Sequence, residues 1–376
     1  MKRVLISLVL MSVATIASAQ LYYEDAVNSQ MLRHSDYRPV ARKEIALPEV
    51  LCGYNVYKAD LHTHTVYSDG DVTPQYRVQE AWLDGLDVIA ITDHIEYRPF
   101  EKKFAEYLGA EIKDVDLNFS VRLAQAEAKK WGMVIIPGTE ITKNGTTVGH
   151  FNALFTTDNN TIPSDDPVLA MRNAKAQGAL VMHNHPGWRK TSIDYTEAEK
   201  TAYDEGLIDG VEVMNHIEFY PGIVDRVRER GLFIAACSDI HETSYNDFGY
   251  SGYLRSMTLI LAKDNSLESL KEALEADRTI AIGFNTICGT EALLGEYVKA
   301  AVSAKKISQS GDVVMLTNTT SIPLLLQFGD SNPVYLDPFT TIRVKGKKNE
   351  NTVEFNVLNA FVTNTRPGHL NVILSF

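Results

Sequence analysis

Short apolar runs alternate with amphipathic segments over most of the first 290 residues. Leu86 to Thr92, Phe233 to Cys237 and Met257 to Ala262 are continuous apolar runs of strand length. Such runs are typical of strands that are buried on both faces. The segments between the runs have a helical period, as in the one that begins with the N-cap pair Thr73-Pro74 and ends near Gly85. This alternation predicts repeated β-α-β units and a largely parallel sheet.

The same pattern predicts the remaining elements of the large domain. We expect further strands at 54–61, 133–136, 149–155, 179–182, 210–215 and 279–282, and helices at about 116–131 and 167–178. The segment 149–155 would return in a hairpin across Asn144-Gly145, and Thr196 with Glu199 has the spacing of a capping box. This number of units favours a closed or distorted barrel of about seven strands. An open doubly wound sheet is the alternative, because periodicity does not show closure.

The pattern changes after about residue 290. One more amphipathic helix includes Leu294 and Val298, and the rest alternates with a period of two, as in Val353, Phe355 and Val357. This predicts a small β-sandwich-like C-terminal domain at 290–376, interpreted as a structural cap in preference to a substrate-binding module. The expected divisions before it are a signal peptide at 1–19, a lead-in at 20–52 and the main domain at 53–289.

The first 19 residues have the pattern of a secretory signal. Lys2 and Arg3 precede an apolar run from Val4 to Ile16, and the small residues of Ala17-Ser18-Ala19 follow it. We expect cleavage after Ala19, a periplasmic or secreted bacterial protein, and no membrane span after cleavage. The apolar run is too short to cross a membrane comfortably, so a retained anchor is the weaker alternative.

Composition narrows the function classes. The chain has 376 residues, 45% of them hydrophobic, which is enough for a large buried core. A net charge of −12 without a basic stripe argues against a nucleic-acid-binding patch and against binding to anionic membranes. Cys52, Cys237 and Cys288 lack CxxC spacing, so we interpret them as small apolar residues and not as disulfides.

The stretch DLHTHTVYSDG, residues 60–70, contains the strongest candidate chemistry. His62 and His64 lie two apart at the end of a predicted strand, so their imidazoles would share one face, about 7 Å apart at the backbone. Gly70 would let the turn bring Asp69 back toward them. Six histidines and three acids occupy similar positions at or just beyond strand ends: His62, His64, His94, His150, His185, His241, Asp69, Glu140 and Asp239.

Histidine and carboxylate ligands without thiolates suit Zn, Mn or Fe, and they differ from the ligands of a closed structural zinc site. Residues of these types recur at or just beyond most predicted strand ends, and this recurrence favours a metal site over a chance arrangement. His183 is predicted to share a strand face with His185, so from the residues alone either of them is a candidate ligand.

In order along the chain, DLHTHTVYSDG, ITDH, PGTE, GHFNAL, HPG and SDIH resemble the PHP (polymerase and histidinol phosphatase) superfamily of metal-dependent phosphoesterases. The resemblance implies a distorted seven-stranded β/α barrel with two or three divalent ions, held by the nine residues named above. The family's ligand precedes Pro-Gly, which favours His185 over His183. Within the superfamily the chain is most similar to secreted bacterial phosphodiesterases with a small C-terminal β domain.

Two acids and three arginines are candidates for supporting roles. Asp93 and Glu212 are interpreted as acceptors that orient a ligating imidazole, with helix capping as the alternative for Asp93. Arg98, Arg189 and Arg255 follow the motifs and are weak candidates for binding the substrate phosphate. Arg255 is preferred, because a planar guanidinium can bind two phosphate oxygens.

The predicted function is hydrolysis of a small-molecule phosphodiester, with a hydroxide that bridges two ions as nucleophile and no protein nucleophile. A phosphomonoesterase of the histidinol-phosphate or nucleotide type uses the same metals and is the main alternative. Amidohydrolase-type carbonyl hydrolysis is less favoured, since it usually needs a carbamylated lysine where this chain has Glu140. A non-catalytic binding protein would be favoured by missing ligands, and the chain lacks none.

Overall fold

The computed structural model describes residues 22–34, 41–108, 115–142, 148–249, 251–307, 313–347, 351–363 and 369–376. The predicted signal peptide and the turn at Asn144-Gly145 lie outside the described residues. The chain divides into two compact units, residues 1–41 and 42–376. The described part of the first unit is a mostly exposed hairpin of β1 (Tyr22–Glu24) and β2 (Leu32–His34).

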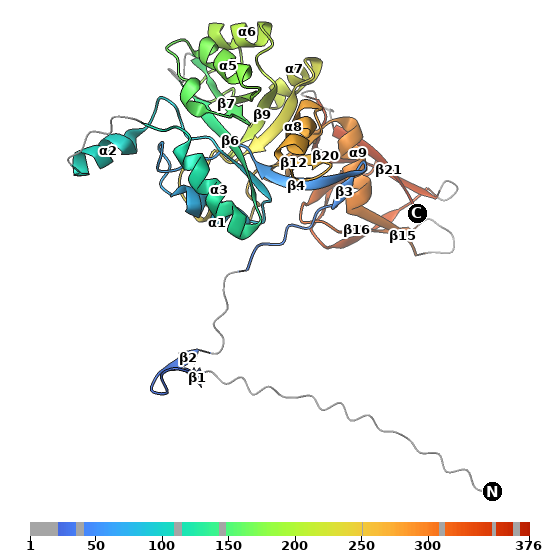
Figure 1. The fold of residues 1–376 in the computed structure, drawn as a ribbon. Coiled ribbons are helices and arrows are strands. Elements are labelled where there is room, and N and C mark those ends of the chain that lie inside the picture. Colours follow the sequence, from blue (N-terminus) through green and yellow to red (C-terminus); the bar gives the residue numbers. More distant parts are fainter. Residues whose placement is uncertain are drawn as a thin grey trace. The chain divides into compact units, whose positions relative to one another are not determined.

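The second unit is built on one large sheet (Figure 1). Seven strands of this sheet form a ladder in the order β4-β5-β6-β7-β8-β9-β11. The candidate ligands lie at one end of this ladder, His150 at the N-terminal end of β7 and the others at or beyond C-terminal strand ends. Their bounds are β4 (Tyr54–Asp60), β5 (Val88–Ile91), β6 (Val134–Ile141), β7 (His150–Leu154), β8 (Leu180–Asn184), β9 (Gly210–Asn215) and β11 (Phe233–Cys237). Short strands β3 (Val50–Leu51) and β10 (Glu218–Phe219) pair with β4 and β9.

Helices connect these strands and cover the sheet (Figure 1). Several begin and end at the residues that the sequence indicates: Thr73 caps α1, Gly132 takes a left-handed φ of 66° after α3, and Thr196 with Glu199 forms the capping box of α6. The helix bounds are α1 (Pro74–Leu83), α2 (Pro99–Leu108), α3 (Phe119–Trp131), α5 (Pro167–Ala176), α6 (Glu197–Asp204), α7 (Val224–Glu229), α8 (Leu267–Glu275) and α9 (Glu291–Ala301), with short helical turns at Asn159–Thr161, Pro221–Ile223 and Tyr245–Gly249.

The expectation of a largely parallel sheet is wrong in part. β4 with β5, β5 with β6, β8 with β9 and β9 with β11 are parallel, but β7 is antiparallel to both β6 and β8. The reason is the short connection between β6 and β7: it spans residues 142–149, fewer than a parallel crossover needs. On its other side β4 pairs antiparallel with β12 (Met257–Ala262), which pairs with β13 (Thr279–Gly283).

The two ends of the seven-stranded ladder meet only locally. One isolated parallel bridge joins Thr63, beyond β4, to Ile240, beyond β11. The backbone N–H of His64 donates to Ile240 at 3.1 Å, and that of Asp239 donates to His62 at 3.0 Å. These contacts join the strand extensions that carry candidate ligands, but among the described residues they are not a continuous ladder between β4 and β11.

The C-terminal region is rich in strands, as the alternating pattern indicates. A three-stranded sheet contains β15 (Val302–Lys306), β16 (Val313–Asn318) and β19 (Thr341–Lys345). The other strands continue the main sheet, because β14 (Thr286–Gly289) pairs in parallel with β20 (Thr352–Phe361). β20 also pairs with β17 (Leu324–Gln327) and β21 (His369–Ser375), and β17 pairs with β18 (Val334–Leu336).

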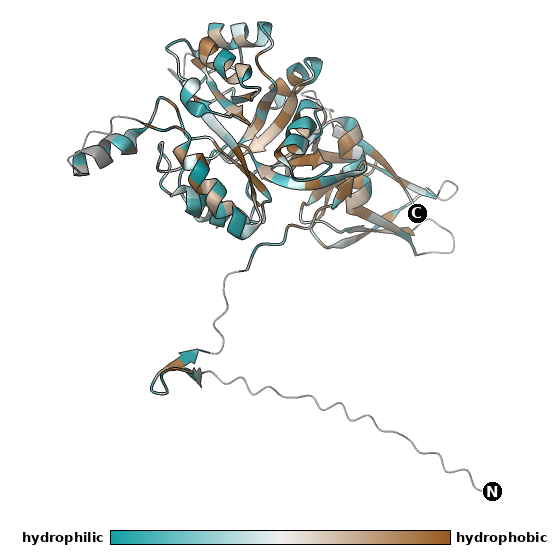
Figure 2. Cartoon of the chain, in the orientation of Figure 1, coloured by the Kyte–Doolittle hydropathy of each residue, from teal (hydrophilic) through white to brown (hydrophobic). Residues whose placement is uncertain are grey.

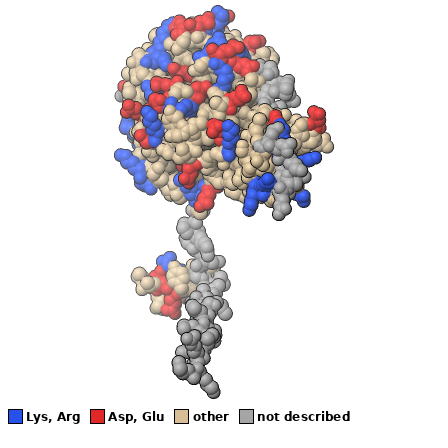
Figure 3. Space-filling view, turned by 90° about the vertical axis from the view of Figure 1, so that its right-hand side faces the viewer, with Lys and Arg blue, Asp and Glu red and all other residues tan. Residues whose placement is uncertain are grey.

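The apolar residues gather on the inner strands, while the helices present hydrophilic faces outward (Figure 2). One buried cluster runs without interruption from α1 and β5 through β12 and β13 to α9, β16 and β20, so the C-terminal region shares its core with the rest of the unit. Lys, Arg, Asp and Glu are interspersed on the face in Figure 3. No described helix has both the length and the apolar content needed to cross a bilayer.

Candidate metal centre

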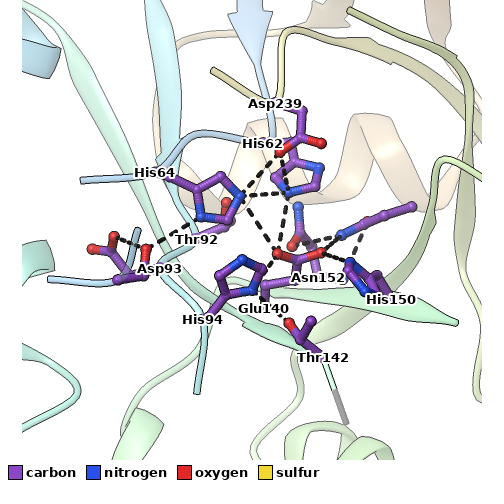
Figure 4. Close-up of polar contacts among 12 residues, drawn as sticks. His62, His64, Thr92, Asp93, His94, Glu140, Thr142, His150, Asn152 and Asp239 are labelled. Carbon is purple, nitrogen blue, oxygen red and sulfur yellow. Dashed lines mark hydrogen bonds and ion pairs between the residues drawn. The ribbon is translucent and has the colours of Figure 1, made fainter. Parts of the chain in front are cut away.

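The candidate ligands come together because they extend adjacent strands at one end of the ladder. His62 and His64 follow β4, and Asp239 and His241 follow β11, where the Thr63–Ile240 bridge holds the two extensions side by side. A second isolated bridge pairs His94 with Glu140. Parallel strands present their C-terminal ends at the same edge, so ligands far apart in sequence meet there (Figure 4).

All nine predicted ligands lie in groups whose nitrogen and oxygen atoms are within 4.8 Å of one another. The groups overlap, so they form one continuous centre. They are His64 with Asp69, His94 and His241; His62 with His185 and Asp239; His62 with His64 and Glu140; and Glu140 with His150 and His185.

Glu140 lies at the middle of the centre (Figure 4). Its Oε2 is 3.4 Å from Nε2 of both His62 and His64 and 2.7 Å from Nδ1 of His94. Its Oε1 is 3.0 Å from Nδ1 of His150 and accepts a hydrogen bond from the amide of Asn184 at 2.9 Å. The two oxygens therefore face different imidazoles, as a carboxylate shared by two ions requires.

Asp69 reaches the centre through a tight turn. Its carboxylate lies 3.6 Å from Nδ1 of His64, 3.4 Å from Nε2 of His94 and 3.3 Å from Nε2 of His241. A Cβ atom on Gly70 would lie 2.6 Å from the carbonyl carbon of His64. The turn therefore closes only with glycine at position 70.

Two ligands adopt left-handed backbone conformations that are uncommon for their residue types. His185 has a φ of 24° and Asp239 a φ of 51°, and such strain often occurs at functional sites. The prediction that His183 and His185 share a face is wrong, because β8 ends at Asn184 and the backbone turns there. His183 instead contacts Tyr203 and Glu199, while His185 points into the centre.

Three buried carboxylate oxygens indicate which kind of ligand the centre fits. Oδ1 of Asp69, Oε2 of Glu140 and Oδ1 of Asp239 accept no hydrogen bond of ordinary geometry. Buried carboxylate oxygens normally have partners, because desolvation without compensation is costly. Imidazole nitrogens surround these oxygens without being aligned as donors. The lone pairs of carboxylate oxygens and imidazole nitrogens converge in the centre, as the binding of divalent cations requires. Histidine together with carboxylate suits Zn, Mn or Fe.

The electrostatics keep the three acids ionised. Although burial raises the pKa of Glu140, the imidazoles of His94, His62 and His150 lower it to well below the usual range. Burial also raises the pKa of Asp239, but the imidazoles of His62 and His64 lower it to well below the usual range. Ionised carboxylates are the form that binds a metal ion.

Glu212 and Asp93 support the ligands differently. Glu212 is fully buried, accepts from Nδ1 of His62 at 2.7 Å and accepts from the backbone N–H of His185 at 2.8 Å. It thereby fixes the tautomer of His62 with Nε2 free to bind an ion. Among the described residues, Asp93 contacts no imidazole and caps no helix: it accepts from Thr65 and from Ser68, whose hydroxyl lies 3.3 Å from Nδ1 of His64.

Two of the three candidate arginines bind groups of the chain itself, which corrects the prediction that Arg255 and Arg98 bind the substrate phosphate. Arg255 is 2% exposed and donates to Asp60 at 2.8 and 2.9 Å, because this buried carboxylate needs a counter-charge. Arg98 donates to Glu101 and to the carbonyl of His94. Arg189 is exposed, and its guanidinium lies 4.3 Å from the Trp188 ring centre.

Sequence reasoning missed Asn184 and Trp188. Asn184 bridges Glu140 and Asn152, and its position within HNHPG next to a candidate ligand is the signal that would have indicated it. The Trp188 ring lies 5.2 Å from His150 and 5.3 Å from His185, centre to centre. Trp188 therefore covers the end of the centre at which Arg189 is exposed.

Comparisons with known proteins agree with this geometry. The family model of the PHP domain matches residues 60–276. A crystal structure from Bacteroides vulgatus, described as a two-domain protein containing a predicted PHP-like metal-dependent phosphoesterase, is 32% identical with a TM-score of 0.81, covering 90% of this chain and 100% of that chain. An uncharacterized protein, MJ1295 of Methanocaldococcus jannaschii, is 27% identical over 186 residues, which are 48% of this chain and 67% of that protein.

Proposed function

The chain belongs to the PHP domain family of metal-dependent phosphoesterases, and from this premise we propose that it is an exported phosphodiesterase that uses two or three divalent ions. The substrate is a small phosphate diester. The Bacteroides vulgatus protein, similar over its whole length, supports the phosphoesterase class through its description. Export rests on the signal pattern at 1–19, and a distorted barrel at the centre rests on the strand-end contacts between Thr63 and Ile240.

One observation carries the proposal: three buried carboxylate oxygens without hydrogen-bond donors face six imidazoles in one continuous centre. A merely structural ion needs about four ligands in a closed set. Nine ligands in four overlapping groups exceed that need and fit ions that share carboxylates.

The residues have distinct roles in this mechanism. The nine ligands would hold the ions, Glu140 would offer both of its oxygens, and Glu212 holds His62 in the tautomer that leaves Nε2 free. Bound divalent ions would supply Lewis-acid chemistry, lowering the pKa of water and neutralising charge on the phosphoryl oxygens. The described site offers a metal-dependent route that needs no protein nucleophile.

Arg189 is the candidate that remains for contact with the substrate. Within the described part of the chain it makes no ion pair, and it stacks on Trp188 beside His150 and His185. Stacking orders the guanidinium before binding. A cation in this place would attract the second ester group or the non-bridging oxygens of a diester.

The test compares a diester with a monoester. The protein beginning at residue 20 is stripped with chelator, reloaded separately with Mn²⁺, Zn²⁺ and Fe²⁺, and assayed with bis-(p-nitrophenyl) phosphate and p-nitrophenyl phosphate. We expect at least two ions per chain, activity that disappears on chelation, and a higher kcat/KM for the diester. A higher kcat/KM for the monoester would show a phosphatase, and activity that survives chelation would exclude the metal-dependent mechanism.

Two variants sharpen the assay. E140Q keeps the size of the side chain but removes the shared charge, so we expect it to bind fewer ions and to lose at least about 10³-fold in kcat/KM, which corresponds to roughly 4 kcal/mol of transition-state stabilisation. R189M should raise KM about 10-fold and leave metal content unchanged. The matched control R172M removes an exposed arginine that pairs with Glu205 and should change neither quantity.

A further inference from the structure

A buried polar group lies behind the centre and takes no part in the chemistry above. It consists of His183, Lys190, Glu199 and Tyr203, which we name the Glu199 cluster. The Glu199 side chain is fully buried. Its Oε1 accepts from Lys190 and lies 3.0 Å from Nε2 of His183, and its Oε2 accepts from the backbone N–H of Thr196 at 2.7 Å.

These contacts define the protons and charges within the Glu199 cluster. An ionised carboxylate only accepts, so Nε2 of His183 donates to Glu199, and Nδ1 accepts from the Tyr203 hydroxyl at 2.9 Å. Burial lowers the pKa of His183 and raises that of Tyr203, so both are neutral. Lys190 is therefore the counter-charge of Glu199.

The Glu199 cluster touches both segments that carry one end of the metal centre. Gly149 precedes the ligand His150, and a Cβ atom at Gly149 would lie 2.5 Å from Oε1 of Glu199. Lys190 lies in the loop 185–196, which begins at the ligand His185 and includes Trp188. Glu199 thus contacts the backbone next to one ligand and holds the loop that follows the other.

A small cavity connects the Glu199 cluster with the centre. Its volume is about 10 Å³, and its lining includes His150, His185 and Trp188 of the centre together with Lys190 and Glu199 of the cluster. This is the space of about one water molecule. Movement of the loop that contains Lys190 would therefore displace the imidazoles of His150 and His185.

We infer that Glu199 is a positioning residue for the part of the centre formed by His150 and His185. It anchors the loop after His185 through Lys190 and supports the backbone before His150, so that both imidazoles converge on Glu140. The inference rests on the proposed function to the extent that the centre binds ions. The opposite group, His64 with Asp69, His94 and His241, is held by other contacts, including those of Asp93, and does not depend on Glu199.

The experiment measures ion binding instead of turnover. Metal-free wild type, E199Q and K190M are titrated with Mn²⁺, and bound ions are counted after equilibrium dialysis. In both variants we expect at least one ion to bind about 10–100-fold more weakly, as for other residues that orient ligands, while at least one ion keeps its wild-type affinity. D93N, which loosens the loop beside His64, should weaken an ion at the opposite end, so the double variant D93N/E199Q should weaken both classes.

The control separates positioning from lost stability. S266A removes the N-cap of α8, which follows the end of β12 that pairs with Asn55, at the opposite end of β4 from His62. It should lower the unfolding midpoint while ion affinities stay unchanged. K190M leaves the capping box of α6 intact and carries the same prediction if E199Q fails to fold.

Wild-type affinities for all ions in both E199Q and K190M, or an equal loss for every ion, would overturn the inference. A folded wild-type protein that binds no ions would overturn it together with the proposed function. Ion binding without cleavage of any phosphodiester would overturn only the proposed function.

Discussion

Arg255 and Asp60 form a buried ion pair beneath the metal centre. Both side chains are almost fully buried, and Asp60 also accepts from the backbone N–H groups of His62 and Ser238, at 3.3 and 3.1 Å. A nearby opposite charge is what stabilises a carboxylate in such an environment. The pair therefore acts on stability and on the position of the ligand strands, without contact to a substrate.

R255M should be strongly destabilising. It leaves the Asp60 carboxylate buried without its counter-charge, and removal of one partner from a buried pair costs about 3–5 kcal/mol. The double variant D60N/R255M should be more stable than R255M alone, because the fully buried charge is removed and the other acid paired with Arg255, Asp84, is partly exposed. Urea unfolding of the metal-free proteins measures both values, and a double variant no more stable than R255M would contradict this account.

Individual residues differ in how far the sequence could identify them. The nine ligands were accessible because each lies at or just after a predicted strand end, and strand ends of parallel units meet at one edge. The different directions of His183 and His185 were not accessible, because His185 leaves the strand with a positive φ. The burial of Arg255 was not accessible either, since a motif does not reveal whether an arginine already has a partner such as Asp60.

The turn after β4 and helix α9 offer a matched pair of glycine substitutions with opposite expected signs. In the turn, a Cβ atom on Gly70 would overlap the backbone of His64 at 2.6 Å, whereas in α9 a Cβ atom on Gly295 would meet nothing within 4 Å. G70A should destabilise the protein by at least about 1–3 kcal/mol through overpacking and weaken the ion at Asp69. G295A should stabilise it by about 0.5–1 kcal/mol, because alanine is the better helix former.

Both effects appear in urea unfolding, with metal content as the second measurement. If G295A destabilised the protein, the space beside Gly295 in α9 would have to be filled by another group in solution. A G70A protein with wild-type metal content would show that the turn can rearrange without loss of the Asp69 ligand.

Glu199 in helix α6 should make the stability of the protein depend on pH. Although burial raises the pKa of Glu199, hydrogen bonds from His183 and Lys190 lower it to about 2 from an ordinary value of 4.5. A depressed acid pKa stabilises the folded state above the unfolded pKa, and this contribution is lost as the pH falls from about 4.5 toward 2. The difference in unfolding free energy between wild type and E199Q, both metal-free, should thus be constant above pH 6 and shrink below pH 4.5.

The exposed Glu205, at the end of the same helix, provides the comparison. It pairs with Arg172 on the surface, so E205Q should change stability little at any pH. A gap between wild type and E199Q that stays constant down to pH 3 would mean that the Glu199 pKa is not depressed.

At the level of elements, local signals were sufficient for position and type. The bounds of β9, β11 and β12 match the predicted apolar runs, and the capping box of α6 is present. Neither α2 nor β14 is among the predicted elements. α2 begins with Pro99, and proline starts turns as well as helices, so the signal is ambiguous. β14 returns from β13 through the turn Phe284-Asn285, where both residues have a positive φ without the glycine that usually marks such a hairpin.

The continuity of the core decides how the whole molecule responds to truncation. Leu294, Tyr297 and Val298 of α9 are fully buried in the same cluster as Ile280 and Ile282 of β13. β14 continues into the C-terminal sheet through Ile287 and Cys288, which pair with Ala360 and Phe361. Removal of residues 290–376 would therefore expose part of the main core instead of detaching an independent module.

A protein that ends at Gly289 should for this reason lose cooperative folding and bind a hydrophobic dye such as 8-anilinonaphthalene-1-sulfonate, because apolar area exposed on this scale outweighs the few kcal/mol by which domains are stable. Its near-ultraviolet circular dichroism should weaken as side-chain packing is lost. A protein that begins at Arg42 is the matched control: residues 1–41 are a separate compact unit, so it should keep the unfolding midpoint and the metal content of the longer chain. If the chain that ends at Gly289 instead unfolded cooperatively and bound the same number of ions, the centre would depend only on the seven strands that carry its ligands, and the C-terminal region would be a module that can be removed.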